Sequence, residues 1–419
     1  MNLKETDRNN IWHPLTQHKT HPEVLPIAKA KGALLFDMEG NSYIDGIASW
    51  YTCMYGHCNS YIIEKVHAQM QELDQIVFSG FTHRPAIELS EKLLNILPQN
   101  QQKVFFSDNG STATEVGMKM ALQYHFNKKN ERHTILAFEE AFHGDTFGAM
   151  SASGLSVYNG PFEKHFIDIV RIPVPTFKTI DTILNQVQDL HADHQLAGFI
   201  YEPLVQGAAG MKMHNAEAIN PILSFCKTND IITIADEVMT GFGKTGTLFA
   251  SEQIETKPDV ICLSKALTAG MLPMAITTCS QPIFDAFYSA DMSKGLFHAH
   301  TYTANPLACA AAIAGIDLLL SEEIQKNRNR INKAHLNFQK RLSGNNKVNN
   351  VRVKGVIFAL ELNTKMERYG SMRDQLFAHF KSAGVFLRPL GNTIYILPPY
   401  VITDKQLEQV YQSILELVV

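Results

Sequence analysis

Two apolar segments of the chain end in residues that can do chemistry. Residues 231–235 lead to Asp236, and residues 259–264 lead to Lys265. Such runs are typical of buried strands, and open α/β sheets carry their ligand sites at the carboxyl ends of the strands. A lysine there can form a Schiff base with pyridoxal phosphate, while a carboxylate keeps the pyridine nitrogen protonated so that the ring withdraws electrons. The pair therefore indicates pyridoxal-phosphate chemistry.

A third segment, residues 107–115, follows a predicted strand and begins a predicted helix. Gly110 allows close backbone approach, Ser111 and Thr112 supply hydroxyls, and the helix start supplies free N–H groups, so the segment can bind a phosphate. Taken alone it is explained as well by an ordinary helix cap. Beside a lysine and an aspartate of this kind, phosphate binding is the favoured interpretation.

Other side chains are weaker candidates. Phe142 follows a predicted strand and could stack on a planar cofactor, although an isolated aromatic is more often part of a core. Thr301, in a polar loop before a helix, could donate its hydroxyl to a phosphate. Arg388 could hold a carboxylate bidentately or simply be a surface residue. Trp50 and Tyr51 could line an apolar substrate pocket or pack in the core.

Two further patterns are better explained without function. Gly241 to Gly246 matches the GxGxxG pattern of dinucleotide sites, but residues 247–252 are a weak helix start, so a structural glycine loop is favoured over NAD or ATP binding. His298 and His300 have no acidic or cysteine partner at ligand spacing, so we predict no metal site.

The elements that must position these residues alternate between helix and strand, which favours a mostly parallel sheet flanked by helices. The predicted helices of this region are 60–76, 85–97 and 111–127, and the strands lie near 103–107, 133–138, 197–202, 231–236, 259–263 and 274–279. A β-hairpin is predicted over 32–46, and a long helical stretch over 307–321 that continues through 322–343. Short strands at 351–362, 385–389 and 393–397, with helices at 371–383 and 404–418, indicate a separate smaller α+β domain.

Bulk properties fit an ordinary globular protein. The 419 residues suggest two or three domains, with 45% hydrophobic and 19% charged residues. The net charge of −4 argues against nucleic acid or an anionic membrane as a partner. No apolar run approaches the roughly 20 residues of a membrane span, and the first residues lack a signal-peptide core. The six cysteines form no CxxC pair, which predicts buried thiols of a cytoplasmic protein.

Together these segments resemble the class III (fold type I) pyridoxal-phosphate aminotransferases over nearly the whole chain. Within that class the resemblance is to the branch that aminates 8-amino-7-oxononanoate to 7,8-diaminononanoate in biotin biosynthesis. The segments that narrow it are Ile11-Trp12-His13-Pro14, Ala48-Ser49-Trp50, residues 143–151, residues 305–310, and Arg388-Pro389 with Tyr395 and Pro398-Pro399-Tyr400.

The resemblance implies a fold and an assembly. The fold is α/β, with a mostly parallel seven-stranded sheet and flanking helices in a large cofactor-binding domain over 51–320. Residues 321–419 are expected to form a smaller α+β domain, which the segment 1–50 joins. The family pattern also implies a homodimer with shared active sites.

The resemblance further implies roles for single residues. Lys265 is expected to bind the cofactor and shuttle the proton, with Asp236 on the pyridine nitrogen. The remaining expected cofactor contacts are Gly110, Ser111 and Phe142, with His300 and Thr301 of the partner subunit. Expected substrate contacts are Leu15, Trp50, Tyr51, Phe142, Lys265, Ala299, Tyr395 and Arg388, the last on the substrate carboxylate.

Differences from the family pattern bear on the substrates. Ornithine-type relatives mask the substrate arginine with a glutamate where this chain has alanine (Ala208-Ala209), so Arg388 is expected to be free. Leu15 and Phe142 stand where many relatives have tyrosine, which removes two phenols worth about 0.5–1.5 kcal/mol each as hydrogen-bond partners. Lys244 occupies a position where relatives commonly have an arginine. The amino donor therefore stays open between S-adenosylmethionine and lysine. The rival functions are another class III ω-aminotransferase or aminomutase, and a nucleotide-binding enzyme built on the loop 241–246.

Overall fold

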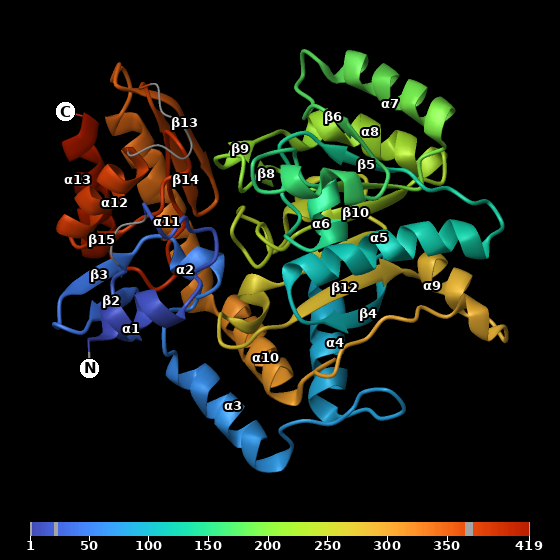
Figure 1. The fold of residues 1–419 in the computed structure, drawn as a ribbon, viewed down its shortest axis with the longest axis horizontal. Coiled ribbons are helices and arrows are strands. Elements are labelled where there is room, and N and C mark those ends of the chain that lie inside the picture. Colours follow the sequence, from blue (N-terminus) through green and yellow to red (C-terminus); the bar gives the residue numbers. More distant parts are fainter. Residues whose placement is uncertain (1, 21–23, 365–371, 419) are drawn as a thin grey trace.

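A seven-stranded sheet forms the centre of the larger half of the molecule, in the computed structural model that describes residues 2–20, 24–364 and 372–418 (Figure 1). The strand order is β4-β12-β11-β10-β7-β5-β6. Strand β12 is antiparallel to both of its neighbours, and the other strands all run in one direction. This confirms the mostly parallel sheet. The strands are β4 (Gln101–Ser107), β5 (Ile135–Phe138), β6 (Ile169–Ile172), β7 (Gly198–Tyr201), β10 (Ile232–Asp236), β11 (Val260–Leu263) and β12 (Ala275–Ser280).

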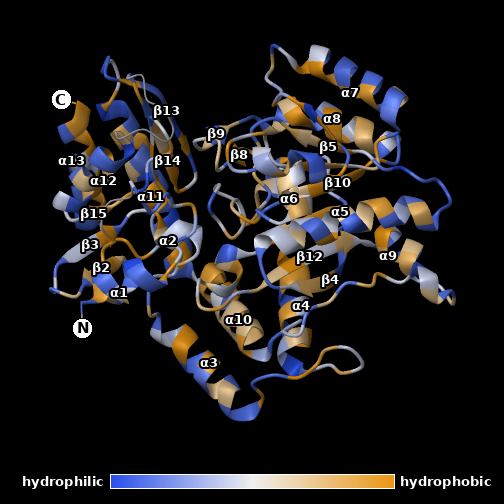
Figure 2. Cartoon of the chain, in the orientation of Figure 1, coloured by the Kyte–Doolittle hydropathy of each residue, from blue (hydrophilic) through white to orange (hydrophobic). Residues whose placement is uncertain are grey.

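Helices cover both faces of this sheet, which is why its central strands are apolar throughout rather than alternating. Every residue of β5, β7, β10 and β11 is buried. Figure 2 shows hydrophobic colouring on β10 and β12, whereas the outer helix α7 alternates between hydrophobic and hydrophilic residues. The other elements of this half are α3 (Ser60–Glu72), α4 (Arg84–Ile96), α5 (Gly110–Asn127), α6 (Phe147–Ala152), η1 (Gly160–His165), α7 (Ile180–His194), β8 (Val205–Gln206), β9 (Lys212–Met213), α8 (Ala216–Thr228), η2 (Ala250–Gln253), η3 (Lys265–Thr268), α9 (Gln281–Phe287), η4 (Met292–Lys294) and α10 (Pro306–Leu320).

The two ends of the chain form the smaller half together. Strand β3 pairs in parallel with β15, so that Ile44 lies opposite Val385 and Asp45 opposite Phe386. The blue and red segments of Figure 1 accordingly lie side by side. The pairing supports the expected division at 1–50, 51–320 and 321–419, which stays a prediction. The elements are α1 (Leu3–Asn10), β1 (Ile27–Lys31), β2 (Leu34–Asp37), β3 (Ser42–Asp45), α2 (Ala48–Tyr51), α11 (Glu322–Arg341), β13 (Val348–Lys354), β14 (Ile357–Leu362), α12 (Met372–Ser382), β15 (Val385–Phe386), β16 (Thr393–Ile396) and α13 (Asp404–Val418).

The structure refines several predicted elements. The hairpin over 32–46 is confirmed as β2 and β3. The segment 351–362 is two antiparallel strands, because Gly355 turns the chain with a φ of +58°. The helical stretch 307–343 is interrupted at Ser321, whose hydroxyl accepts the Ile324 N–H and so begins α11. Strand β6 and helices α7 and α8 were not among the predicted elements. No helix in the described part of the chain is both long and apolar enough to cross a membrane.

The glycine loop 241–246 connects the two halves. The Arg328 guanidinium of α11 is buried and donates hydrogen bonds to the carbonyls of Gly243 (3.1 Å), Gly246 (2.6 Å) and Thr247 (3.1 Å). The Tyr400 hydroxyl donates to the Phe242 carbonyl at 2.6 Å. The loop is therefore held by side chains of the C-terminal segment.

Replacing Arg328 with methionine should lower the free energy of unfolding by about 2–4 kcal/mol, because buried carbonyls lose a charged donor. Urea unfolding of the purified protein measures this. The matched control is Lys326→Met on the same helix, whose pair with Glu322 is exposed and should matter by less than about 0.5 kcal/mol. Equal effects of the two substitutions would show that the loop does not depend on Arg328.

Candidate active site

Four adjacent parallel strands deliver polar side chains to one edge of the sheet. Lys265 follows β11, Asp236 ends β10, Glu202 follows β7, and His143 lies in the loop after β5. The strand order places these four strands next to one another. Because the carboxyl ends of parallel strands meet at the same edge, residues far apart in sequence come together there.

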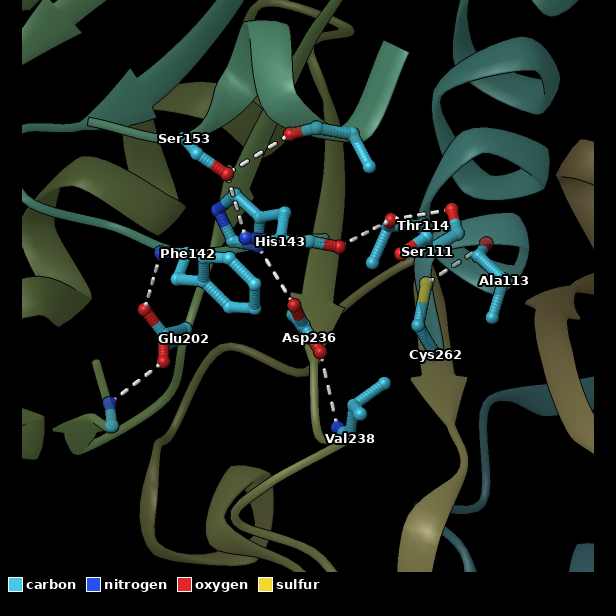
Figure 3. A network of polar contacts seen from close by, with 12 residues as sticks. Ser111, Ala113, Thr114, Phe142, His143, Ser153, Glu202, Asp236, Val238 and Cys262 are labelled. Atoms are coloured by element: carbon cyan, nitrogen blue, oxygen red, sulfur yellow. Dashed lines mark hydrogen bonds and ion pairs between the residues drawn. The ribbon is translucent and has the colours of Figure 1, made fainter. Parts of the chain in front are cut away.

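Asp236 is held by His143 at the centre of this group (Figure 3). Its Oδ2 lies 2.7 Å from the His143 Nδ1, and its Oδ1 accepts the Val238 N–H at 3.0 Å. Both side chains are buried. The histidine backbone is fixed too, since its N–H donates to the Ser153 hydroxyl and its carbonyl accepts from Thr114. The sequence analysis gave His143 no role. The available signal was its place after the predicted strand 133–138, since Asp236 and Lys265 also stand at the ends of predicted strands.

Glu202 is a second buried carboxylate at this edge of the sheet, and the sequence had predicted no role for it. Its Oε1 accepts the Phe142 N–H at 3.0 Å and its Oε2 accepts the Gly207 N–H at 2.9 Å. Burial and the nearby Asp236 raise the pKa of Glu202, while His143 and the two backbone donors lower it, and the net pKa is about 7. Glu202 thus fixes the loop that carries Phe142, whose side chain is 41% exposed at the edge of the site.

Lys265 carries an amine that has no polar partner among the residues that the structure describes. Its backbone is left-handed, with a φ of +51°. The Nζ lies 5.3 Å from the centre of the Tyr51 ring, and no hydrogen bond or ion pair joins it to any residue that the structure describes. Burial lowers the pKa of Lys265, while Asp236 and Glu202 act in the opposite sense. A desolvated amine of this kind can act as a nucleophile and as a base.

The start of α5 forms the helix cap that the sequence offered as one alternative, and the phosphate site stays a prediction. The Asn109 side chain accepts the Thr112 N–H, and the Thr112 hydroxyl accepts the Asn109 N–H. Thr112 is therefore engaged in the cap, which corrects the idea that it supplies a hydroxyl to phosphate. The Ser111 hydroxyl accepts the Asp145 N–H at 3.1 Å. Gly144 passes so close that an added Cβ would overlap this hydroxyl.

These groups fit pyridoxal phosphate. An unpaired lysine amine, a carboxylate clamped by an imidazole, and a helix start with a serine and a glycine at close approach match its aldehyde, ring nitrogen and phosphate in chemical type. Phe142 supplies an exposed aromatic ring beside them.

A left-handed turn presents two aromatic rings to two cations. Ser49 and Trp50 have φ, ψ values of 46°, 57° and 66°, 45°, and Ala48 and Tyr51 also have positive φ. This conformation is unfavourable by about 1–2 kcal/mol for each non-glycine residue. The Trp50 ring lies 4.7 Å from the Arg388 guanidinium, a cation–π contact. Within the described chain Arg388 has no hydrogen bond or ion pair, so it can bind a carboxylate.

Some of the predicted residues are separate from this group. Tyr395 is buried on β16 with its ring 5.9 Å from Tyr51. Ala299, His300 and Thr301 lie in the loop between η4 and α10, where the Thr301 carbonyl accepts from the Gln75 side chain at 2.8 Å. The described contacts of that loop do not include Lys265 or Asp236. Leu15 is 44% exposed in the loop after α1. The roles of these residues stay predictions.

The glycine loop 241–246 is not built as a nucleotide site. The N–H of Gly241 donates to the Glu237 carbonyl at 2.9 Å, and that of Gly243 donates to the Leu248 carbonyl at 2.8 Å. Both donors that would meet a phosphate are therefore engaged. Lys244 is fully buried, its Nζ donates to the Gly241 carbonyl at 3.0 Å, and burial lowers its pKa to about 7. This supports the structural interpretation of the loop.

Comparison with known proteins agrees with this geometry. A family model described as aminotransferase class-III matches residues 15–418. The adenosylmethionine-8-amino-7-oxononanoate aminotransferase of Synechococcus elongatus is 41% identical over 421 residues, covering 97% of this chain and 98% of that one. The protein of the same name from Helicobacter pylori is 34% identical, with 99% and 97% covered.

Solved structures give the same family. The crystal structure of adenosylmethionine-8-amino-7-oxononanoate aminotransferase from Methanocaldococcus jannaschii has a TM-score of 0.93 at 32% identity, covering 99% of this chain and 98% of that one. A PLP-bound amine transaminase from an uncultivated Pseudomonas species has a TM-score of 0.91 at 28% identity, with 98% of both chains covered. The chain belongs to the class III aminotransferases and is a pyridoxal-phosphate-dependent enzyme.

Proposed function

We propose that this enzyme aminates 8-amino-7-oxononanoate to 7,8-diaminononanoate in biotin biosynthesis. The names of its full-length relatives support the substrate. The structural observation that carries the proposal is Arg388. Its guanidinium lies over Trp50, within the described residues it has no anionic partner, and the same turn places Tyr51 against Lys265. A substrate with a carboxylate and a ketone to be aminated suits a site that offers both a cation and a reactive amine.

The chain contributes binding and proton transfer. Bound pyridoxal phosphate supplies an electron sink that carries the amino group from donor to acceptor in two half-reactions. The Lys265 Nζ would take a proton from the amine-bearing carbon of the donor and pass it to the bound cofactor. In the second half-reaction it would move a proton the other way, from the cofactor to the former carbonyl carbon of the acceptor. Asp236, fixed by His143 and Val238, presents a carboxylate to the ring nitrogen. Gly110 and Ser111 bind the phosphate.

We propose S-adenosylmethionine as the amino donor, because the relatives bear its name; lysine is the alternative. Leu15 and Phe142 lack the phenols found in many relatives, so the donor pocket offers fewer hydrogen-bond partners at these two positions.

Mixing the yellow holoenzyme with S-adenosylmethionine should bleach its absorbance, and adding 8-amino-7-oxononanoate should restore it with formation of the diamine. The Lys265→Ala variant should lose turnover by at least about a thousandfold, because the transferred proton then has no base. Stopped-flow absorbance and product analysis measure both steps. Bleaching by lysine alone would identify lysine as the donor. Failure of the oxononanoate to restore the colour would rule it out as the acceptor and favour an ω-aminotransferase.

Replacing Gly144 with alanine should weaken cofactor retention by about tenfold or more, because the new Cβ displaces the Ser111 hydroxyl that we assign to the phosphate. Dialysis of the holoenzyme followed by absorbance measures the cofactor that remains. The matched control is Gly160→Ala, since an added Cβ there meets nothing within 4 Å. Unchanged retention in the Gly144 variant would place the phosphate elsewhere.

We infer a homodimer whose active sites are shared. The loop that carries Thr301 is flanked by exposed apolar side chains, Phe297 (77% exposed) and Tyr302 (63%), with Phe81 (58%) on the loop after the Gln75 that bonds to Thr301. Exposed apolar groups of this size mark interaction surfaces. His300 and Thr301 of the partner subunit would complete the phosphate site that Ser111 begins.

Mixing two inactive variants, Lys265→Ala and Thr301→Asp, through unfolding and refolding should restore activity. In a mixed dimer, one of the two sites combines the intact Lys265 of one subunit with the intact Thr301 of the other. Random assortment makes about half of the dimers mixed, so about a quarter of the wild-type rate should return. The control mixes Lys265→Ala with Asp236→Asn, whose positions belong to the same subunit's site and should not complement. Recovery in neither mixture, or a monomer in sedimentation equilibrium, would contradict the shared site.

We infer a cytoplasmic location. All six cysteines are free, which is typical of a reducing compartment. Four are buried, but Cys53 is only partly buried and Cys58 is exposed, which corrects the expectation that all six lie inside.

A further inference from the structure

A buried carboxylate stands behind the turn that carries Trp50 and Tyr51. Asp45, at the end of β3, is fully buried. Its Oδ2 accepts the Ser49 hydroxyl at 2.9 Å and lies 2.8 Å from the His57 Nε2, and its Oδ1 accepts the Ile47 N–H at 3.2 Å. These partners lie before, within and after the turn. One side chain therefore ties together the whole segment from residue 47 to residue 57.

The turn between these partners has a conformation that its own residues disfavour. Four successive non-glycine residues, Ala48 to Tyr51, have positive φ. Conformations of this kind persist only where the surrounding structure fixes them. The Ser49 hydroxyl, in the middle of the four, is bound to Asp45 and lies 3.4 Å from the His57 Nε2. The hydrogen bonds of Asp45 and His57 are thus placed to hold this turn.

The same strand end also sets the position of Arg388. Asp45 lies opposite Phe386 in the β3–β15 pairing, and Phe386 is two residues before Arg388. The next residue, Gly46, donates its N–H to the Phe386 carbonyl at 3.0 Å and accepts the Leu397 N–H at 2.9 Å. The backbone at Asp45 and Gly46 therefore helps to set the positions of both Arg388 and the Trp50 ring.

We propose that Asp45 and His57 are positioning residues of the substrate site: their hydrogen-bonded pair holds the left-handed turn so that Trp50 lies under Arg388 and Tyr51 under Lys265. Neither residue contacts a reacting atom. The inference rests on the proposed binding of a substrate carboxylate by Arg388.

The charge of His57 supports this arrangement. Burial lowers the pKa of His57, but the hydrogen bond with Asp45 and the nearby Cys53 outweigh it and raise the pKa to about 10. The charged and titratable groups that face this imidazole are Asp45 and Cys53, with the Ser49 hydroxyl. A raised pKa means that the pair stabilises the fold fully below the unfolded value of 6.5 and ceases to do so as the pH rises through about 10.

The test uses the holoenzyme in a Trp12→Phe background, which leaves Trp50 as the only tryptophan. His57→Leu should raise the KM for 8-amino-7-oxononanoate by about tenfold, with kcat and cofactor absorbance changed less than about twofold. Iodide quenching of Trp50 fluorescence should increase in the same variant, without any substrate present. His57→Gln, which can still donate to Asp45, should restore both readouts most of the way. Because the imidazolium persists to high pH, the wild-type KM should begin to rise only near pH 10, and the rise should be absent in His57→Gln.

Controls separate a local from a general effect. His379→Gln removes another partly buried histidine, which bonds to the Ser413 carbonyl on α13, and should leave KM and quenching unchanged. If His57→Leu does not fold, Ser49→Ala, which deletes one hydroxyl, should raise the KM in the same direction. A folded His57→Leu enzyme with wild-type KM and wild-type quenching overturns the inference. A wild-type enzyme that does not aminate the oxononanoate overturns the proposed function instead, and the quenching result still decides the position of Trp50.

Discussion

The parallel order of four neighbouring strands is the constraint on which the rest of the site depends. Strands β11, β10, β7 and β5 lie side by side and run in one direction, so the residues that follow them meet at one edge. A lysine, two carboxylates and a histidine are concentrated there without any local sequence motif that joins them. The helices on both faces keep the strands buried, and the backbone ladder fixes the spacing between successive strand ends at the strand-to-strand distance.

Burying so many ionisable groups is costly, and the structure offsets this cost one group at a time. Asp236 receives an imidazole and a backbone N–H, and Glu202 receives two backbone N–H groups. Lys265 has no such partner among the described residues, and burial lowers its pKa. The contrast is informative, because a group that only stabilised the fold would be satisfied like the carboxylates. An amine left without a hydrogen bond is suited to covalent binding of a cofactor.

The substrate side of the site belongs to the smaller half of the molecule and is set by contacts between the two ends of the chain. The β3–β15 pairing joins residues more than three hundred positions apart and brings Trp50 to Arg388. The glycine loop 241–246 makes a second connection between the two halves, since Arg328 and Tyr400 donate hydrogen bonds to its carbonyls. The position of the arginine relative to the lysine is thus a property of how the two halves are joined.

The candidate chemical residues and the class of the fold could be predicted from the amino-acid sequence. The apolar runs that end in Asp236 and Lys265 indicate strand ends, and the Gly110–Ser111 segment indicates a helix start. These signals are local, so they can be interpreted without knowing what lies nearby. The folded arrangement was needed to show that His143 holds Asp236 from 93 positions away, that Glu202 is buried with a raised pKa, and that residues 48–51 turn left-handed. Each of these depends on neighbours supplied by distant segments, and neither a carboxylate's environment nor an unfavourable backbone conformation is set by the residue alone.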